Sequence, residues 1–104
     1  MRVRKTPVEV GRLANGIMTV CATLKNSAVG ICGVSVRAGS RDETSDSYGL
    51  AHFVEHTIFK GTQRRSSSLI INRMEAVGGE LNAFTSKDET VVYSAFPGGN
   101  LSRA

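Results

Sequence analysis

The two histidines of the chain, His52 and His56, lie four residues apart, and Glu55 stands between them. If this stretch is helical, positions i and i+4 share one face, so both imidazoles can reach one metal ion. Zinc accepts neutral imidazole nitrogens and carboxylate oxygens in tetrahedral geometry. Glu55, about one turn from His52, can hydrogen-bond a water beside the metal without binding the metal itself. The spacing therefore predicts a zinc site with an adjacent general base, which is typical of metal-assisted hydrolysis.

The alternative for this cluster is a solvated helix face that binds no metal. Two histidines placed at random among 104 positions fall four apart in roughly 2% of arrangements. A glutamate at the required intermediate place lowers that fraction to about 0.1%. Chance therefore accounts poorly for the pattern.

An amphipathic helix of about three turns is predicted to carry the three residues. The side chains of its core-facing stripe recur at positions i, i+3, i+4, i+7 and i+8, and they are Leu50, Phe53, Val54, Thr57 and Ile58. Lys60-Gly61-Thr62 is expected to end the helix. At 100° per residue the aliphatic side chains centre nearly opposite the histidines and the glutamate, so the stripe can anchor the helix while the polar face stays available.

The other elements predict an α+β fold in the order β-β-β-α-α-β-β, an antiparallel sheet with helices packed on one face. Three antiparallel strands are expected at 8–13, 17–24 and 29–36, with a turn at Asn15-Gly16 after the first and the polar Lys25-Asn26-Ser27 after the second. A second helix at 69–77 has N-caps in Ser66 to Ser68 and a stop at Gly78-Gly79. Two further strands follow at 81–85 and 90–96, and Asn100 is expected to cap a helix that begins at Leu101.

Cys21 and Cys32 lack the C-x-x-C spacing of a redox or zinc motif. We interpret them as two half-buried thiols in a reducing compartment. The alternative is a cross-strand disulfide, because a tight turn at Asn26-Ser27 would place the two cysteines opposite each other.

Composition excludes several classes of protein. The 104 residues carry a net charge of +4, with 21% charged and 40% hydrophobic residues, as in ordinary globular domains. Transmembrane helices need about 18 consecutive apolar residues, which are absent, so we expect no membrane partner. Without a long basic stripe, we expect no nucleic acid partner. The basic start lacks an apolar segment after it, so no secretory signal is expected, and the cytoplasm or an organelle matrix is favoured without being settled.

Four blocks of the sequence resemble the pitrilysin family, which includes insulysin and the mitochondrial processing peptidases. The blocks agree in order and spacing over most of the chain, and they are Gly39-Ser40-Arg41, Gly49 to His56, Phe59 to Thr62, and Leu81 to Thr85. The central block contains H-x-x-E-H, the inverzincin signature. The resemblance implies that residues 1–104 are a single partial domain, the N-terminal portion of a metallopeptidase domain truncated at its C-terminus.

The resemblance also implies a role for each matching residue. His52 and His56 would bind Zn²⁺, and Glu55 would deprotonate the attacking water. Asn82 and Ala83 match the family's short strand beside the metal, which receives the backbone of the peptide substrate by strand addition. An ordinary packing role for that strand is the alternative. The implied activity is that of a zinc-dependent metalloendopeptidase acting on extended or unfolded peptides.

The chain departs from the family pattern in one respect. The family's third zinc ligand is a glutamate on a later helix, which is expected beyond Ala104. Glu80, Asp88 and Glu89 are the acidic residues left to replace it, and their spacing does not suggest that they do. The family also closes two halves around the peptide, so a C-terminal half or a second homologous domain or subunit is the expected partner.

Two other functions stay open at this point. One is a non-catalytic binding or assembly subunit of the same fold, although such relatives usually lack an intact motif. The other is an inert fragment, because the chain stops where a helix is expected to begin. By itself the chain is expected to be inactive, since a catalytic zinc site normally has three protein ligands.

Overall fold

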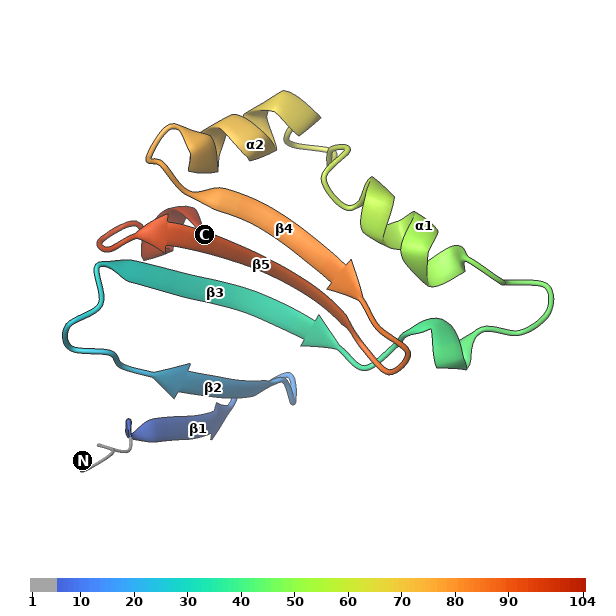
Figure 1. Cartoon of the computed structure of the whole chain (residues 1–104), viewed down its shortest axis with the longest axis horizontal. Helices are drawn as coiled ribbons and strands as arrows, with labels where there is room; N and C mark the ends of the chain where they lie inside the picture. Colours follow the sequence, from blue (N-terminus) through green and yellow to red (C-terminus); the bar gives the residue numbers. More distant parts are fainter. Residues whose placement is uncertain (1–5) are drawn as a thin grey trace.

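The computed structural model describes residues 6–104, which form two antiparallel sheets and two α-helices (Figure 1). Strands β1 and β2 form one sheet, and the other has the strand order β3-β5-β4. The predicted α+β class and order of elements are confirmed. Their bounds are β1 Val8–Arg12, β2 Met18–Ala22, β3 Val29–Val36, the 3-10 helix η1 Ser40–Asp42, α1 Leu50–Thr57, α2 Ser67–Glu75, β4 Glu80–Thr85, β5 Thr90–Pro97 and the 3-10 helix η2 Leu101–Arg103.

The hairpin of β1 and β2 follows from its turn residues. Gly16 has a φ of 91°, in the left-handed region that glycine adopts without strain. The Asn15 side-chain oxygen accepts a hydrogen bond from the Ile17 N–H at 3.1 Å. The register then runs from Val8 opposite Ala22 to Arg12 opposite Met18. The turn predicted at Asn15-Gly16 is confirmed.

The tight hairpin at Asn26-Ser27, which a disulfide between Cys21 and Cys32 would need, does not form. Strand β3 pairs along its whole length with β5, from Val29 opposite Pro97 to Val36 opposite Thr90. The Ser27 hydroxyl instead bonds the backbone of Val29, donating to its carbonyl and accepting from its N–H. β5 offers an eight-residue ladder rich in β-branched and aromatic side chains, so this distant pairing prevails over the local turn signal. The single predicted sheet is therefore two sheets.

The change of pairing also separates the cysteines. Cys21 lies opposite Glu9 in the first sheet, and Cys32 lies opposite Ser94 in the second. Both thiols are free and exposed, so the half-buried environment expected for them is wrong, and no disulfide joins them.

Helix α2 is present, but it runs over Ser67–Glu75 and so begins and ends two residues before the predicted 69–77, with Ser66 as its N-cap. The Ser66 hydroxyl accepts a hydrogen bond from the Leu69 N–H at 3.2 Å, which satisfies one free donor of the first turn. After the helix, Gly78 has a φ of 75°. At the other end of the chain, the Asn100 amide donates to the Pro97 carbonyl at 3.0 Å instead of capping η2. A 3-10 helix does begin at Leu101 with Asn100 at its N-cap position, as predicted, but the Asn100 side chain makes no capping hydrogen bond.

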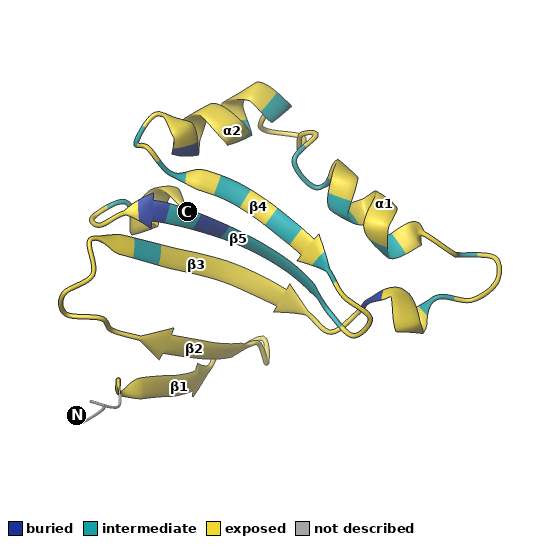
Figure 2. Cartoon of the chain, viewed as in Figure 1, coloured by how far each residue is buried: buried dark blue, intermediate teal, exposed yellow. Residues whose placement is uncertain are grey.

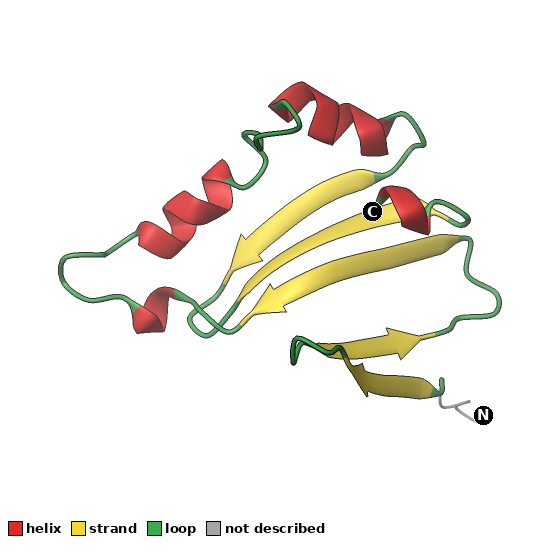
Figure 3. Ribbon diagram, turned by 180° about the vertical axis from the view of Figure 1, so that it is seen from behind, coloured by secondary structure: helices red, strands yellow, loops and turns green. Residues whose placement is uncertain are grey.

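Helices α1 and α2 lie one after the other along β4, and they pack against that strand (Figure 3). The half-buried residues of β4 alternate with exposed ones, as expected for a strand covered on one face, and they are Leu81, Ala83 and Thr85. The prediction that helices cover one face of the sheet is confirmed for the β4 side. Neither helix within residues 6–104 is long and apolar enough to cross a membrane.

The buried core is small and lies around the β5 end near α2 (Figure 2). Among the described residues, the side chains of Met74, Ser94 and Phe96 are buried, while Ile31 on β3 is 72% exposed. The accessible surface is 8669 Å², whereas a compact protein of this mass exposes about 5,600 Å². Both strands of the β1–β2 sheet and most of β3 therefore leave apolar side chains in water.

These uncovered faces predict poor solution behaviour for the chain on its own. We expect the purified 104-residue chain to bind a hydrophobic dye such as ANS and to self-associate as its concentration rises, because contiguous apolar patches of this extent are not stable in water. Dye fluorescence and sedimentation at several concentrations would measure both effects. A monomer that melts sharply and reversibly without binding dye would contradict this expectation.

Candidate functional site

The aliphatic side of α1 faces the three-stranded sheet. Leu50, Val54 and Ile58 line a hollow of about 340 Å³ together with Val36 and Val92 of the sheet. This is the anchoring role predicted from the helical angles. The helix itself is shorter than predicted, because it ends at Thr57 and continues only as a turn toward Lys60.

His52 and His56 lie on the exposed side of α1, with their rings directed at each other. Their Nε2 atoms are 2.9 Å apart, and their ring centroids are 4.4 Å apart. Two nitrogen ligands of a tetrahedral zinc, each about 2.0–2.1 Å from the metal, are about 3.3 Å apart. The two Nε2 atoms would thus have to move apart by only a few tenths of an ångström to bind one ion. Two imidazole nitrogens are ligands that fit zinc.

Glu55 is half-buried on the same helix, one residue before His56. Within residues 6–104 its carboxylate has no hydrogen-bond or ion-pair partner, so both oxygens can accept a proton or a hydrogen bond. A carboxylate on the same helix as an imidazole pair is a side chain that can act as a general base toward a water molecule.

The acidic residues considered as replacements for a third ligand do not join the histidines. Within residues 6–104 no three His, Cys, Asp or Glu residues are grouped closely enough to hold a metal. Asp88 forms an ion pair with Arg41 at 2.8 Å, and Glu89 accepts a hydrogen bond from the Ser35 hydroxyl at 2.7 Å. Glu80 is exposed at the start of β4. The described residues therefore supply two of the three protein ligands that a catalytic zinc site normally has.

Asn82 and Ala83 lie in β4, which is an edge strand of the three-stranded sheet. The Asn82 side-chain oxygen accepts a hydrogen bond from the Ala83 N–H at 2.8 Å. In an antiparallel ladder the N–H groups of alternate residues point to opposite sides of the strand. The Ala83 N–H consequently points away from β5, toward the free edge of the sheet, and only a side chain of its own strand occupies it.

Sequence reasoning missed Glu43, in the loop before α1. Its Oε2 accepts a hydrogen bond from the Gly49 N–H and its Oε1 one from the Ala51 N–H, both at 2.9 Å. The N-cap of α1 is Gly49, which has no side chain that could cap the helix. A helix that begins at glycine was the signal that another residue must satisfy these amides.

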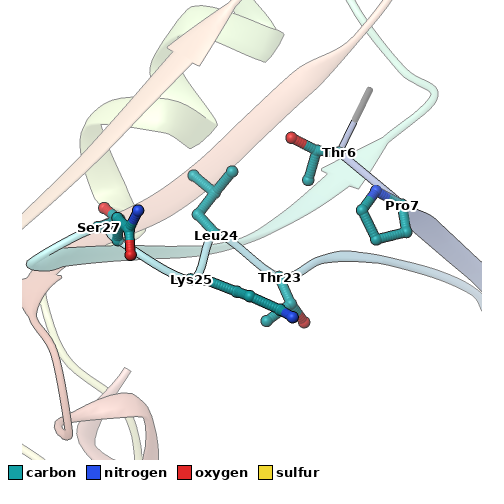
Figure 4. Close-up of a pocket in the computed structure, with 7 residues that line it drawn as sticks. Thr6, Pro7, Thr23, Leu24, Lys25 and Ser27 are labelled. Carbon is teal, nitrogen blue, oxygen red and sulfur yellow. The ribbon is translucent and has the colours of Figure 1, made fainter. Parts of the chain in front are cut away.

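A separate hollow of about 690 Å³ lies beside the loop between β2 and β3 (Figure 4). The described residues that line it include one charged side chain, Lys25, and no histidine, cysteine or acidic residue. It therefore offers no metal ligand or general base, and α1 remains the candidate site.

Comparison with known proteins places the chain in a family. The profile of the insulinase family, peptidase family M16, matches residues 19–104. The chain belongs to this family. The resemblance to the pitrilysin group is thereby confirmed, and the matched region contains α1 and β4.

Individual proteins that are similar to the M16 chain support the same family. It is 38% identical over 95 residues to a protein of Arabidopsis thaliana named as a probable mitochondrial-processing peptidase subunit beta, covering 91% of this chain and 18% of that protein. It is 45% identical over 92 residues to an uncharacterized zinc protease of Mycobacterium bovis, covering 88% and 21%. A crystal structure of a protease from Helicobacter pylori matches with a TM-score of 0.88 at 31% identity, covering 94% and 24%. The M16 chain thus spans about a fifth of the length of these relatives.

Proposed function

We propose that this chain is the N-terminal portion of the catalytic domain of a zinc-dependent metalloendopeptidase. The observation that carries the proposal is the approach of the His52 and His56 Nε2 atoms to 2.9 Å, on a helix that also carries Glu55, whose carboxylate has no partner among residues 6–104. Membership of peptidase family M16 supports the reaction class, and the zinc protease name of one relative supports the metal. A third ligand is expected from a segment after Ala104.

In this proposal His52 and His56 hold the zinc ion through their Nε2 atoms. The bound metal would activate a water molecule and polarise the scissile carbonyl. Glu55 accepts the proton of the attacking water and then delivers it to the leaving amine. Both proton transfers require the carboxylate to be free of other partners, as Glu55 is among the described residues.

The substrate in this proposal is an extended or unfolded peptide that pairs with the free edge of β4. Ala83 offers its outward N–H to the peptide backbone, and the Asn82 amide, which holds that N–H in the free chain, is released to contact the peptide. A folded segment could not present the continuous backbone that this pairing needs. Substrates are therefore expected to be unstructured around the cleaved bond.

The complete active site is expected to need a second domain or subunit that covers the uncovered sheet faces. Relatives named as mitochondrial-processing peptidase subunits support a subunit partner, and their mitochondrial names agree with the organelle matrix as one of the two expected compartments. A non-catalytic assembly subunit is the alternative. The intact His-Glu-His motif favours the catalytic role.

Zinc titration of the 104-residue chain by calorimetry tests the metal site. With two imidazole ligands we expect measurable binding that is weaker than micromolar, and we expect His52→Ala and His56→Ala each to weaken it at least roughly tenfold. Glu75→Gln, at the exposed end of α2, is the control and should bind as the parent chain does. Equal binding by the parent chain and both histidine variants would contradict the site.

A further inference from the structure

We propose that Glu43 is a positioning residue that holds α1, and with it His52 and Glu55, in a set orientation relative to β4. The proposal rests on the proposed function, since that function needs the helix and the edge strand in register. It assigns to the loop before the helix a role that neither the motif nor the comparisons give it.

Glu43 contacts the N-terminus of α1 through both of its carboxylate oxygens. One carboxylate spans two amides, Gly49 N–H and Ala51 N–H, each at 2.9 Å. Charge-assisted bonds at a helix N-terminus are among the stronger ones, because the negative charge also meets the positive end of the helix dipole. An eight-residue helix is too short to persist by propensity alone. The first turn of α1, which includes His52, therefore depends on Glu43.

The segment before Glu43, residues 39–42, is attached to the turn between β4 and β5. The Ser40 N–H donates to the Ser86 carbonyl at 3.1 Å, and the Arg41 N–H donates to the Lys87 carbonyl at 2.9 Å. Gly39 is buried against the same turn, and a Cβ atom there would lie 2.5 Å from the Ser86 oxygen. The junction thus excludes even a methyl group, which fixes the loop on the hairpin that carries β4.

Together the two contacts form a short connection from the β4–β5 turn through residues 39–42 to Glu43 and the start of α1. On its other side α1 packs on the sheet through its aliphatic residues, of which Leu50, Val54 and Ile58 line the 340 Å³ hollow, and it also contacts β4. Such apolar contacts allow a helix to slide, whereas two hydrogen bonds to one carboxylate fix its direction. Loss of Glu43 is expected to free the N-terminal turn of α1 and to turn the histidine rings away from each other.

The test compares Glu43→Ala and Glu43→Gln with the parent 104-residue chain, without metal and at a concentration below that at which the chain self-associates. Asp46→Asn is the matched control, because Asp46 lies in the same loop, is exposed and makes no hydrogen bond within residues 6–104. Two NMR readouts are used: amide exchange of Gly49 and Ala51, and the ring ¹⁵N shifts of His52 and His56, which report the Nε2 contact.

We expect Glu43→Ala to accelerate exchange of the two amides roughly three- to thirtyfold. Glu43→Gln should do so less, because it keeps one acceptor oxygen, and Asp46→Asn should leave exchange unchanged. The ring nitrogen shifts should change in both Glu43 variants and not in the control. A cap whose loss leaves the orientation of α1 unchanged would not move the ring nitrogens.

Two results would overturn the proposal: equal exchange in Glu43→Ala and Asp46→Asn, or faster exchange with unchanged ring nitrogens. If Glu43→Ala does not fold, Glu43→Gln against Asp46→Asn gives the same comparison with equal changes of charge. Absence of zinc binding by the parent chain would contradict the proposed function alone, because neither readout uses the metal.

Discussion

Replacing Glu55 with glutamine is expected to slow the proposed peptide hydrolysis by the full-length protein about 10²–10⁴-fold, the usual contribution of a general base. Glutamine keeps the shape of the side chain, but its amide oxygen does not accept a proton from water at neutral pH. Within residues 6–104 the Glu55 carboxylate has no partner that the change would disturb. Zinc content and thermal stability should therefore stay at the parent values.

The measurement is kcat on an unstructured peptide, together with the metal content of the purified enzyme. Glu75→Gln makes the same chemical change at the end of α2 and should keep full activity. Activity of Glu55→Gln within tenfold of the parent would place the base elsewhere. Loss of zinc together with activity would make Glu55 a ligand instead of a base. A parent enzyme without hydrolytic activity would favour the assembly subunit.

Replacing Ala83 with proline is expected to lower kcat/KM for extended peptides about tenfold or more, with the fold retained. The Ala83 N–H points to the free edge of β4, so proline removes no hydrogen bond to β5. Proline is tolerated at edge strands when the lost N–H faces outward. The substitution instead removes the donor that the peptide would use, and its ring obstructs the edge.

Hydrolysis of a set of unstructured peptides and the circular dichroism melting curve would be measured together. Ala83→Ser is the control, because serine keeps the N–H and remains small. Equal losses in the two variants would mean that the side-chain position matters and the N–H does not. Unchanged kcat/KM in Ala83→Pro would show that the peptide does not pair with this edge.

The local elements were predictable because their signals lie in a few neighbouring residues. Asn15-Gly16 closes the first hairpin, Ser66 caps α2, and the apolar spacing from Leu50 to Ile58 predicts which side of α1 faces the sheet. Each depends on backbone conformations and hydrogen bonds that span only a few positions. The same locality made the spacing of His52 and His56 a prediction of convergence, and their Nε2 atoms do meet.

The sequence failed where distant segments compete for the same strand. In the sequence, β2 was a plausible partner for β3 because only a short polar segment separates them, but β3 pairs with β5. Hydrophobic periodicity does not indicate which of two possible strands will form the longer ladder with a third. The disulfide between Cys21 and Cys32, considered as the alternative to free thiols, depended on that hairpin and does not form. The Asn100 side chain makes no capping bond to η2, and its amide donates to the carbonyls of Pro97 and Gly98.

By itself, therefore, the sequence determined the chemistry of the candidate site: two imidazoles and a carboxylate on one helix, at a spacing that helical geometry makes convergent. Only the tertiary structure decided that β4 is an edge strand with the Ala83 N–H facing outward, and that Glu43 caps the helix across six residues of loop. The physical reason is the distance along the chain between the residues that interact. Side-chain spacing on one helix is set by its backbone period, whereas a free edge and a remote cap exist only after separate elements have packed together.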